Sequence, residues 1–199
     1  MYQKRIKQIS WLASLLMMLF FIKPSLAEHF HYFIDVETTF AVDQNQQLHG
    51  VDVSWVYDEK MSALMKAQNP DLKTLGKKTL NDLSKNHYFI NLAINGQPIK
   101  TGIAQKYQLQ EITDKGKKLL QLDFSLPFEK PISMQGKNKL TWNFADPTGT
   151  GILVYSSVSG VRLVTEPLKS HCKAKMWSND DENKGHGDPE QFLKLKCSL

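Results

Sequence analysis

Alternation of apolar and polar residues runs through most of the chain after residue 28 and favours β-strands. Residues 30–40 are rich in aromatic and β-branched side chains, and residues 48–57 resume the alternation after a polar turn at 43–46. Because strand side chains alternate between faces, the apolar positions of the second segment share one face: Val51, Val53 and Trp55. These two segments predict a β-hairpin.

Two helices are predicted to interrupt the strands between about residues 59 and 86, because apolar residues recur there at helical spacing around the connector Asn69-Pro70-Asp71. Beyond them, Asn95-Gly96 predicts a tight hairpin between strands at 87–94 and 99–112. Later strands are expected at 119–126, 139–144, 152–157 and 161–165. The expected fold class is mainly β (α+β), a β-sandwich or open barrel with a two-helix insertion.

The first 27 residues have the pattern of a secretory signal peptide. Lys4, Arg5 and Lys7 precede an apolar run at 9–22, and small residues precede Ala27 where a signal peptidase would cut. The run is short for a bilayer span. We therefore expect cleavage after Ala27 and a periplasmic protein that does not span the membrane afterwards, with an uncleaved anchor as the alternative.

The basic character of the chain comes mainly from this amino-terminal segment. It holds four of the 25 basic residues and none of the 20 acidic ones, so residues 28–199 are nearly neutral. Residues 28–170 are long enough to form one β-rich domain. No basic run interleaved with aromatic residues is apparent, and nucleic acid is not expected as a partner.

Two cysteines, Cys172 and Cys197, lie near the carboxyl end of the chain. In an oxidising compartment, an even pair this close in sequence predicts one disulfide. The alternative is a soft metal site with His171 and His186, although no CxxC spacing supports it. Residues 171–199 are therefore expected to be a disulfide-tethered tail that includes a polar, acidic segment.

Two histidines follow the predicted cleavage site. Cleavage would leave His29 and His31 close to a free α-amine, and Asp35 follows at an even offset on the predicted strand. Neutral imidazole nitrogens suit zinc, nickel or copper, and a carboxylate can complete the ligand set. The pattern therefore indicates a candidate metal site. The alternative is that His29 frays with the terminus while His31 packs on the sheet.

Asp58 lies where a predicted strand ends and a helix begins. This position suits a helix N-cap, and an acidic residue in the first turn, Glu59, suits the helix dipole. Metal ligation by Asp58 is the alternative. Asp146-Pro147-Thr148-Gly149 predicts a turn.

Familiar catalytic motifs are absent from the sequence. It contains no G-x-S-x-G elbow, P-loop, HExxH or Rossmann glycine pattern. A hydrolase that used Asp58 and Asp146 as acid and base would need both carboxylates in one cleft. We therefore do not expect an enzyme.

Residues 29–35 resemble the opening motif of a known family, H-P-H-V-[WF]-I-D; the sequence here is His29-Phe30-His31-Tyr32-Phe33-Ile34-Asp35. The family consists of periplasmic components labelled ABC-type transport proteins of unknown function, and it includes ZevA. Further similarities follow in order along nearly the whole predicted mature chain: Trp55-x-Tyr57-Asp58-Glu59-x-x-Ser62, Tyr88-Phe89, Leu122-x-Phe124-x-Leu126-Pro127-Phe128, Asp146-Pro147-Thr148 and Cys172.

This resemblance implies a periplasmic accessory protein for transition-metal transport. Such a protein would deliver or gate zinc, or nickel or cobalt, at an inner-membrane permease of the nickel/cobalt exporter type. His29 and His31 would hold the ion exchangeably with Asp35 or Asp58. The competing class is a non-metal β-sandwich binding or scaffold module that docks on a membrane protein.

The chain departs from the family pattern at three places. Phe30 replaces the proline between the histidines, which removes a rigid φ angle. Gly149 and Thr150 stand where the family commonly has tyrosines. Asn69-Pro70-Asp71-Leu72-Lys73 replaces a D-x-D-x-D-G stretch, so we expect no calcium site.

Overall fold

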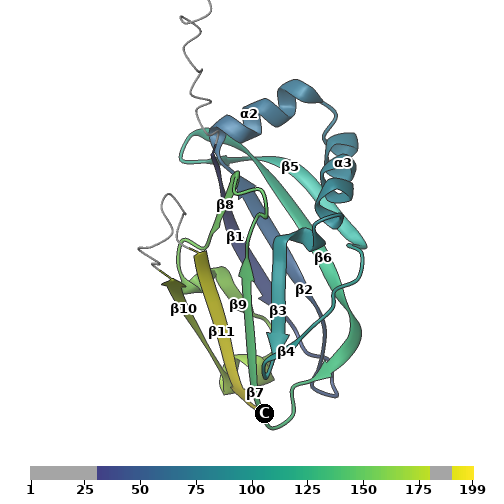
Figure 1. Cartoon of the computed structure of the whole chain (residues 1–199), viewed down its shortest axis with the longest axis vertical. Coiled ribbons are helices and arrows are strands. Elements are labelled where there is room, and N and C mark those ends of the chain that lie inside the picture. The colour runs from purple at the N-terminus through teal and green to yellow at the C-terminus, as the bar shows by residue number, and fades with distance from the viewer. Residues whose placement is uncertain (1–30, 180–189) are drawn as a thin grey trace, which may run out of the picture. The chain divides into compact units, whose positions relative to one another are not determined.

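Two β-sheets and a short helical insertion make up residues 31–179 and 190–199, which are the residues described by the computed structural model (Figure 1). Sheet A has the strand order β5-β6-β2-β1-β8, with β9 also paired to β1, and sheet B has the order β10-β11-β7-β3-β4. The strands of sheet A are β1 (Tyr32–Phe40), β2 (Gln47–Tyr57), β5 (Lys106–Asp114), β6 (Lys117–Ser133), β8 (Gly151–Val154) and β9 (Val161–Leu163). Those of sheet B are β3 (Ile90–Ile94), β4 (Gln97–Pro98), β7 (Lys137–Phe144), β10 (Cys172–Asn179) and β11 (Glu190–Ser198).

The core lies between the inner faces of the two sheets. Val51, Val53 and Trp55 of β2 are all buried, as their spacing predicts. Phe40 of β1 meets Trp142 of β7 edge to face, with the ring centroids 4.9 Å apart. The expected mainly β fold is therefore confirmed, and its architecture is two packed sheets.

The helical insertion consists of α2 (Glu59–Gln68) and α3 (Leu72–Ser84). Figure 1 shows both helices at one end of the sheets, with α3 beside β5. Gly76 permits this close approach, because a Cβ added there would lie only 2.9 Å from Cβ of Leu109 on β5. The two helices lie where the spacing of apolar residues predicts them.

Two predicted strands differ from the observed ones. Residues 87–89 form a short helical turn, η2 (His87–Phe89), whose three residues all have positive φ, so β3 begins only at Ile90. After the Asn95-Gly96 turn, the return strand β4 has two residues, and β5 begins at Lys106 in the other sheet. The return strand is short because β4 pairs with β3 at only two positions, and the chain then continues to β5, which pairs with β6 in sheet A.

The carboxyl-terminal residues are part of sheet B. The sequence predicts a tethered tail over 171–199, whereas β10 and β11 pair antiparallel and β11 lies between β10 and β7. A short helix, α4 (Glu166–His171), leads into β10, and a turn, η3 (Val158–Gly160), precedes β9. No helix within residues 31–179 and 190–199 is long and apolar enough to cross a bilayer.

Candidate functional site

Asp58 joins the start of β1 to the start of α2. Its Oδ1 accepts a hydrogen bond from the backbone N–H of Met61 at 2.7 Å, which caps the helix. Its Oδ2 accepts from the backbone N–H of Phe33, also at 2.7 Å, and its own backbone N–H donates to the Phe33 carbonyl at 2.9 Å. The predicted N-cap is therefore confirmed, and the same carboxylate also fixes the first residues of β1.

Two carboxylates from different parts of the chain lie close enough to Tyr32 to affect its ionisation. The pKa of its phenol is raised above the ordinary value, first by burial and then by the negative charges of Asp146 and Asp58. Asp58 comes from the β2–α2 junction and Asp146 from the β7–β8 connection. Because Tyr32 directly follows His31, negative charge gathers at the start of β1. We call His31, Tyr32, Asp58 and Asp146 the β1-start cluster.

Asp146 organises the turn that brings β8 alongside β1. Its Oδ1 accepts from the Thr148 backbone N–H at 2.9 Å, and its Oδ2 accepts from the Gly151 backbone N–H at 2.8 Å. Gly151 pairs with Tyr32 in the parallel β1–β8 ladder. A Cβ at Gly151 would lie 2.9 Å from the Tyr32 hydroxyl oxygen, so glycine leaves room for the phenol. The predicted turn is present.

The two histidines of the predicted metal site differ in how far the structure describes them. His31 is exposed and immediately precedes β1, whereas His29 lies outside the described residues. Within residues 31–179 and 190–199, no three His, Cys, Asp or Glu side chains come together as a group that could hold a metal ion. Completion of a site at His31 would therefore require a ligand from outside the described residues.

Asp35 lies on the outer face of β1, as its even offset predicts, but it is engaged with another segment. Its Oδ1 accepts hydrogen bonds from the backbone N–H of Ser156 at 3.3 Å and from the Ser156 hydroxyl at 3.0 Å. Four residues of extended strand separate it from His31, which corresponds to about 13 Å. Asp58, by contrast, binds the backbone of Phe33, two residues from His31.

Cys172 and Cys197 lie directly opposite each other on β10 and β11 and form a disulfide. The predicted pairing is confirmed, so neither sulfur is a thiolate ligand for a metal. His171 lies at the end of α4 and is exposed, and His186 lies outside the described residues. A disulfide of this kind is compatible with a secreted protein.

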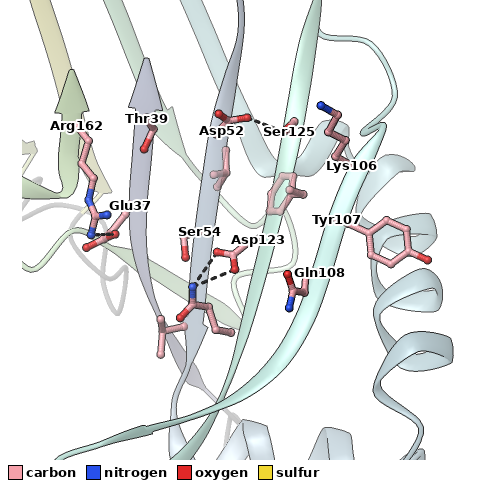
Figure 2. A pocket seen from close by; sticks show the side chains of 14 residues that line it. Glu37, Thr39, Asp52, Ser54, Lys106, Tyr107, Gln108, Asp123, Ser125 and Arg162 are labelled. Atoms are coloured by element: carbon pink, nitrogen blue, oxygen red, sulfur yellow. Dashed lines mark hydrogen bonds and ion pairs between the residues drawn. The ribbon is translucent and has the colours of Figure 1, made fainter. Parts of the chain in front are cut away.

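A shallow groove of about 780 Å³ lies on the outer face of sheet A (Figure 2). Its polar side chains pair with one another. Arg162 forms an ion pair with Glu37 at 2.5 Å, and the Ser125 hydroxyl donates to Asp52 at 2.5 Å. Asp123 accepts from the side-chain amide of Gln121 at 2.8 and 3.0 Å. The groove therefore presents a polar surface whose acidic groups are already partnered.

The sequence pattern did not reveal that Asp146 lies beside Tyr32. The D-P-T motif predicts the turn, but the neighbour depends on the parallel pairing of β1 with β8. One signal was available, since the motif is among those by which the chain resembles a known family. The order of motifs in the chain does not indicate which of them meet in the fold.

Two comparisons place the chain among known proteins. A family model described as "Protein of unknown function (DUF1007)" matches residues 13–193. An uncharacterised protein of Haemophilus influenzae is 29% identical over 162 residues, which cover 78% of this chain and 76% of that protein. Because the family match covers nearly the whole sequence, the chain belongs to the DUF1007 family, a family of unknown function.

Proposed function

We propose that this protein is a periplasmic accessory component of a transition-metal transport system that binds zinc, or nickel or cobalt, and delivers or gates the ion at an inner-membrane permease. The observation that carries the proposal is the β1-start cluster. Asp58 accepts a hydrogen bond from the backbone N–H of Phe33, two residues after His31, and Asp146 accepts one from Gly151, the partner of Tyr32 in the β1–β8 ladder. This accumulation of negative charge favours a cation beside the imidazole.

The proposed ligands are the imidazoles of His29 and His31, assisted by Asp58. A carboxylate has about four lone-pair sites, and the hydrogen bonds from Phe33 and Met61 use two of those on Asp58. Asp146 accepts hydrogen bonds from three donors of the turn, the backbone N–H groups of Thr148 and Gly151 and the Thr148 hydroxyl, and acts through its charge alone. An incomplete ligand set of this kind gives an exchangeable site, as a delivery protein needs.

The resemblance to the transport-associated family, which includes ZevA, supports the same function. Its opening motif contributes His31 and Tyr32, its W-x-F-D-E-x-x-S motif contributes Asp58, and its D-P-T motif contributes Asp146. These three motifs are far apart in the chain, yet their residues meet at the start of β1. A shared site gives a physical reason for their co-occurrence.

Zinc titration by calorimetry tests the proposal. The wild-type protein is compared with a His29→Ala, His31→Ala variant and with a control, His49→Ala, His171→Ala, that removes two exposed imidazoles elsewhere. We expect wild type and control to bind one zinc equally and the first variant to bind more than about tenfold more weakly. Equal binding by all three proteins would refute the proposal.

The second candidate is a non-metal binding or scaffold module, and the groove on sheet A favours it. That surface is large and polar, and it is built from four adjacent strands and β9. A module of this class would keep its affinity for a membrane-protein partner when the β1-start cluster is altered and lose it when Glu37 or Asp52 is changed. A pull-down with solubilised membrane proteins separates the two candidates.

A further inference from the structure

Six lysines gather on the outer face of sheet B, where β10, β11 and β7 lie side by side (Figure 1). Because strand residues alternate between faces, the inner positions of these strands fill the core and the outer positions carry the lysines. The six are Lys137, Lys139, Lys173, Lys175, Lys194 and Lys196. We refer to them, together with Trp177 and Phe192, as the sheet B lysine face.

The strand registers place these charges directly opposite one another. Lys173 pairs with Lys196, which in turn pairs with Lys139, so three lysines form one row across the sheet. Lys175 pairs with Lys194 in the next row. Like charges directly opposite each other on neighbouring strands destabilise a sheet. The protein tolerates this repulsion, and an anionic partner would relieve it.

Little acidic charge lies on the three strands that the structure describes here. The three strands contain a single acidic residue, Glu190, whose carboxylate accepts a hydrogen bond from the Asn143 side chain at the far end of the face. None of the six lysines forms an ion pair within residues 31–179 and 190–199. Apart from these six, residues 28–199 hold 15 basic and 20 acidic residues. The positive charge is therefore concentrated on one side of a chain that is otherwise acidic.

An aromatic pair lies beside the lysines. Trp177 and Phe192 stack with their ring centroids 5.6 Å apart, and the Lys194 ammonium lies 4.8 Å from the centroid of the Trp177 ring. Trp177 remains 38% exposed. Tryptophan beside lysine is suited to the boundary between lipid headgroups and hydrocarbon, because the indole has an apolar body and a polar N–H.

We propose that the sheet B lysine face docks the protein on the surface of an anionic phospholipid bilayer. Headgroup phosphates would approach the lysine rows while Trp177 inserts at the interface. The inference is independent of metal binding and rests on the positions of the lysines and of Trp177. For an exported protein that works with a membrane partner, such docking would confine diffusion to two dimensions.

Vesicle binding tests this proposal, with vesicles of phosphatidylcholine alone compared with vesicles of which about one third is phosphatidylglycerol. The test variant is Lys173→Gln, Lys175→Gln, Lys194→Gln, Lys196→Gln. The matched control is Lys73→Gln, Lys77→Gln, Lys78→Gln, Lys130→Gln, which removes four exposed lysines outside the face. All proteins carry the same amino-terminal segment, so differences between them report the substituted lysines.

We expect wild type to bind the anionic vesicles at least about 100-fold more tightly than the neutral ones, and high salt to abolish the difference. Each lysine near the surface contributes about fivefold, so the test variant should bind about 100-fold more weakly or worse. The control should bind about threefold more weakly at most. Equal binding of wild type to both vesicles, or equal losses in the two variants, would overturn the proposal.

Tryptophan fluorescence supplies a second measurement. Trp11 lies in the amino-terminal segment and is replaced by phenylalanine in every protein compared. Of the other three tryptophans, Trp55 and Trp142 are buried and Trp177 is exposed, so a blue shift on adding anionic vesicles should report Trp177. Trp177→Phe should remove the shift. A shift that persists in this variant would locate the contact elsewhere and contradict the proposal. Binding to DNA or heparin with no binding to vesicles would assign the face to another polyanion and contradict it equally.

Discussion

Replacement of Asp58 by alanine should destabilise the protein more than the loss of an ordinary helix cap. The carboxylate caps α2 through the Met61 N–H and also holds the Phe33 N–H of β1, each at 2.7 Å. An N-cap is worth about 1 kcal/mol. A hydrogen bond to a charged group adds about 1.5–3 kcal/mol, at the lower end where solvent is near. We therefore expect a loss of about 2–4 kcal/mol.

Asp71 provides a matched control within the same protein. It caps α3 by accepting from the backbone N–H groups of Lys73 and Thr74 at 3.2 and 3.3 Å and from the Thr74 hydroxyl, and it forms no bond to a strand. Asp71→Ala removes a cap and a hydrogen bond to a local hydroxyl, whereas Asp58→Ala removes a cap and a bond to the β1 backbone. Asp71→Ala should therefore cost less than Asp58→Ala. Urea unfolding at neutral pH measures both losses. If the two variants lose equal stability, the reasoning that Asp58 fastens β1 is refuted.

Three further predictions concern stability. Ser62→Ala should lower the free energy of unfolding in urea by about 1–3 kcal/mol. The buried Ser62 hydroxyl donates to the Tyr57 carbonyl at 3.1 Å and accepts from a backbone N–H of β6 at 2.8 Å. An unchanged unfolding midpoint would contradict this. Reduction of the Cys172–Cys197 disulfide, which closes a separation of 25 residues, should lower the free energy of unfolding by about 3 kcal/mol, and an unaltered melting temperature would argue against it. Burial raises the pKa of Tyr57 and Tyr155 above the unfolded value of about 10. Above that pH the unfolded state releases protons that the folded state still holds, so the free energy of unfolding should fall as pH rises above about 10. Phenolate absorbance should show these two phenols ionising only on unfolding, and full ionisation of the native protein would refute the assignment.

Local patterns predicted the parts of the fold that depend on local rules. The alternation of apolar and polar residues predicted strands β1 and β2, and it also predicted which side chains of β2 are buried, because every second residue lies on the same face. Asp58 was recognisable as a cap because a polar residue directly precedes a helical pattern. Asn95-Gly96 marks a turn wherever it occurs between strands.

Pairing between distant segments was not predictable in this way. The return strand after Asn95-Gly96 ends at Pro98, because the chain then crosses to pair with β6. Strands β10 and β11 were missed because their outer positions are charged, although lysine at every second position was a visible signal. The sheet B lysine face depends on the order of three strands, and no single segment contains enough of it to be recognised.

The same limit applied to the β1-start cluster. His31 and Asp58 were identified by residue type and position, but their relation to Asp146 depends on a parallel ladder between β1 and β8. Parallel neighbours need long connections, so sequence proximity does not reveal them.

Anomalous diffraction at the zinc absorption edge, from crystals soaked in zinc, tests the central claim most directly. We predict a peak beside the His31 imidazole at the start of β1, close to the Asp58 carboxylate, and its loss in the His29→Ala, His31→Ala variant. A wild-type crystal with no peak there, or a peak that persists in the variant, would contradict the claim that this end of the sheet holds the transported ion.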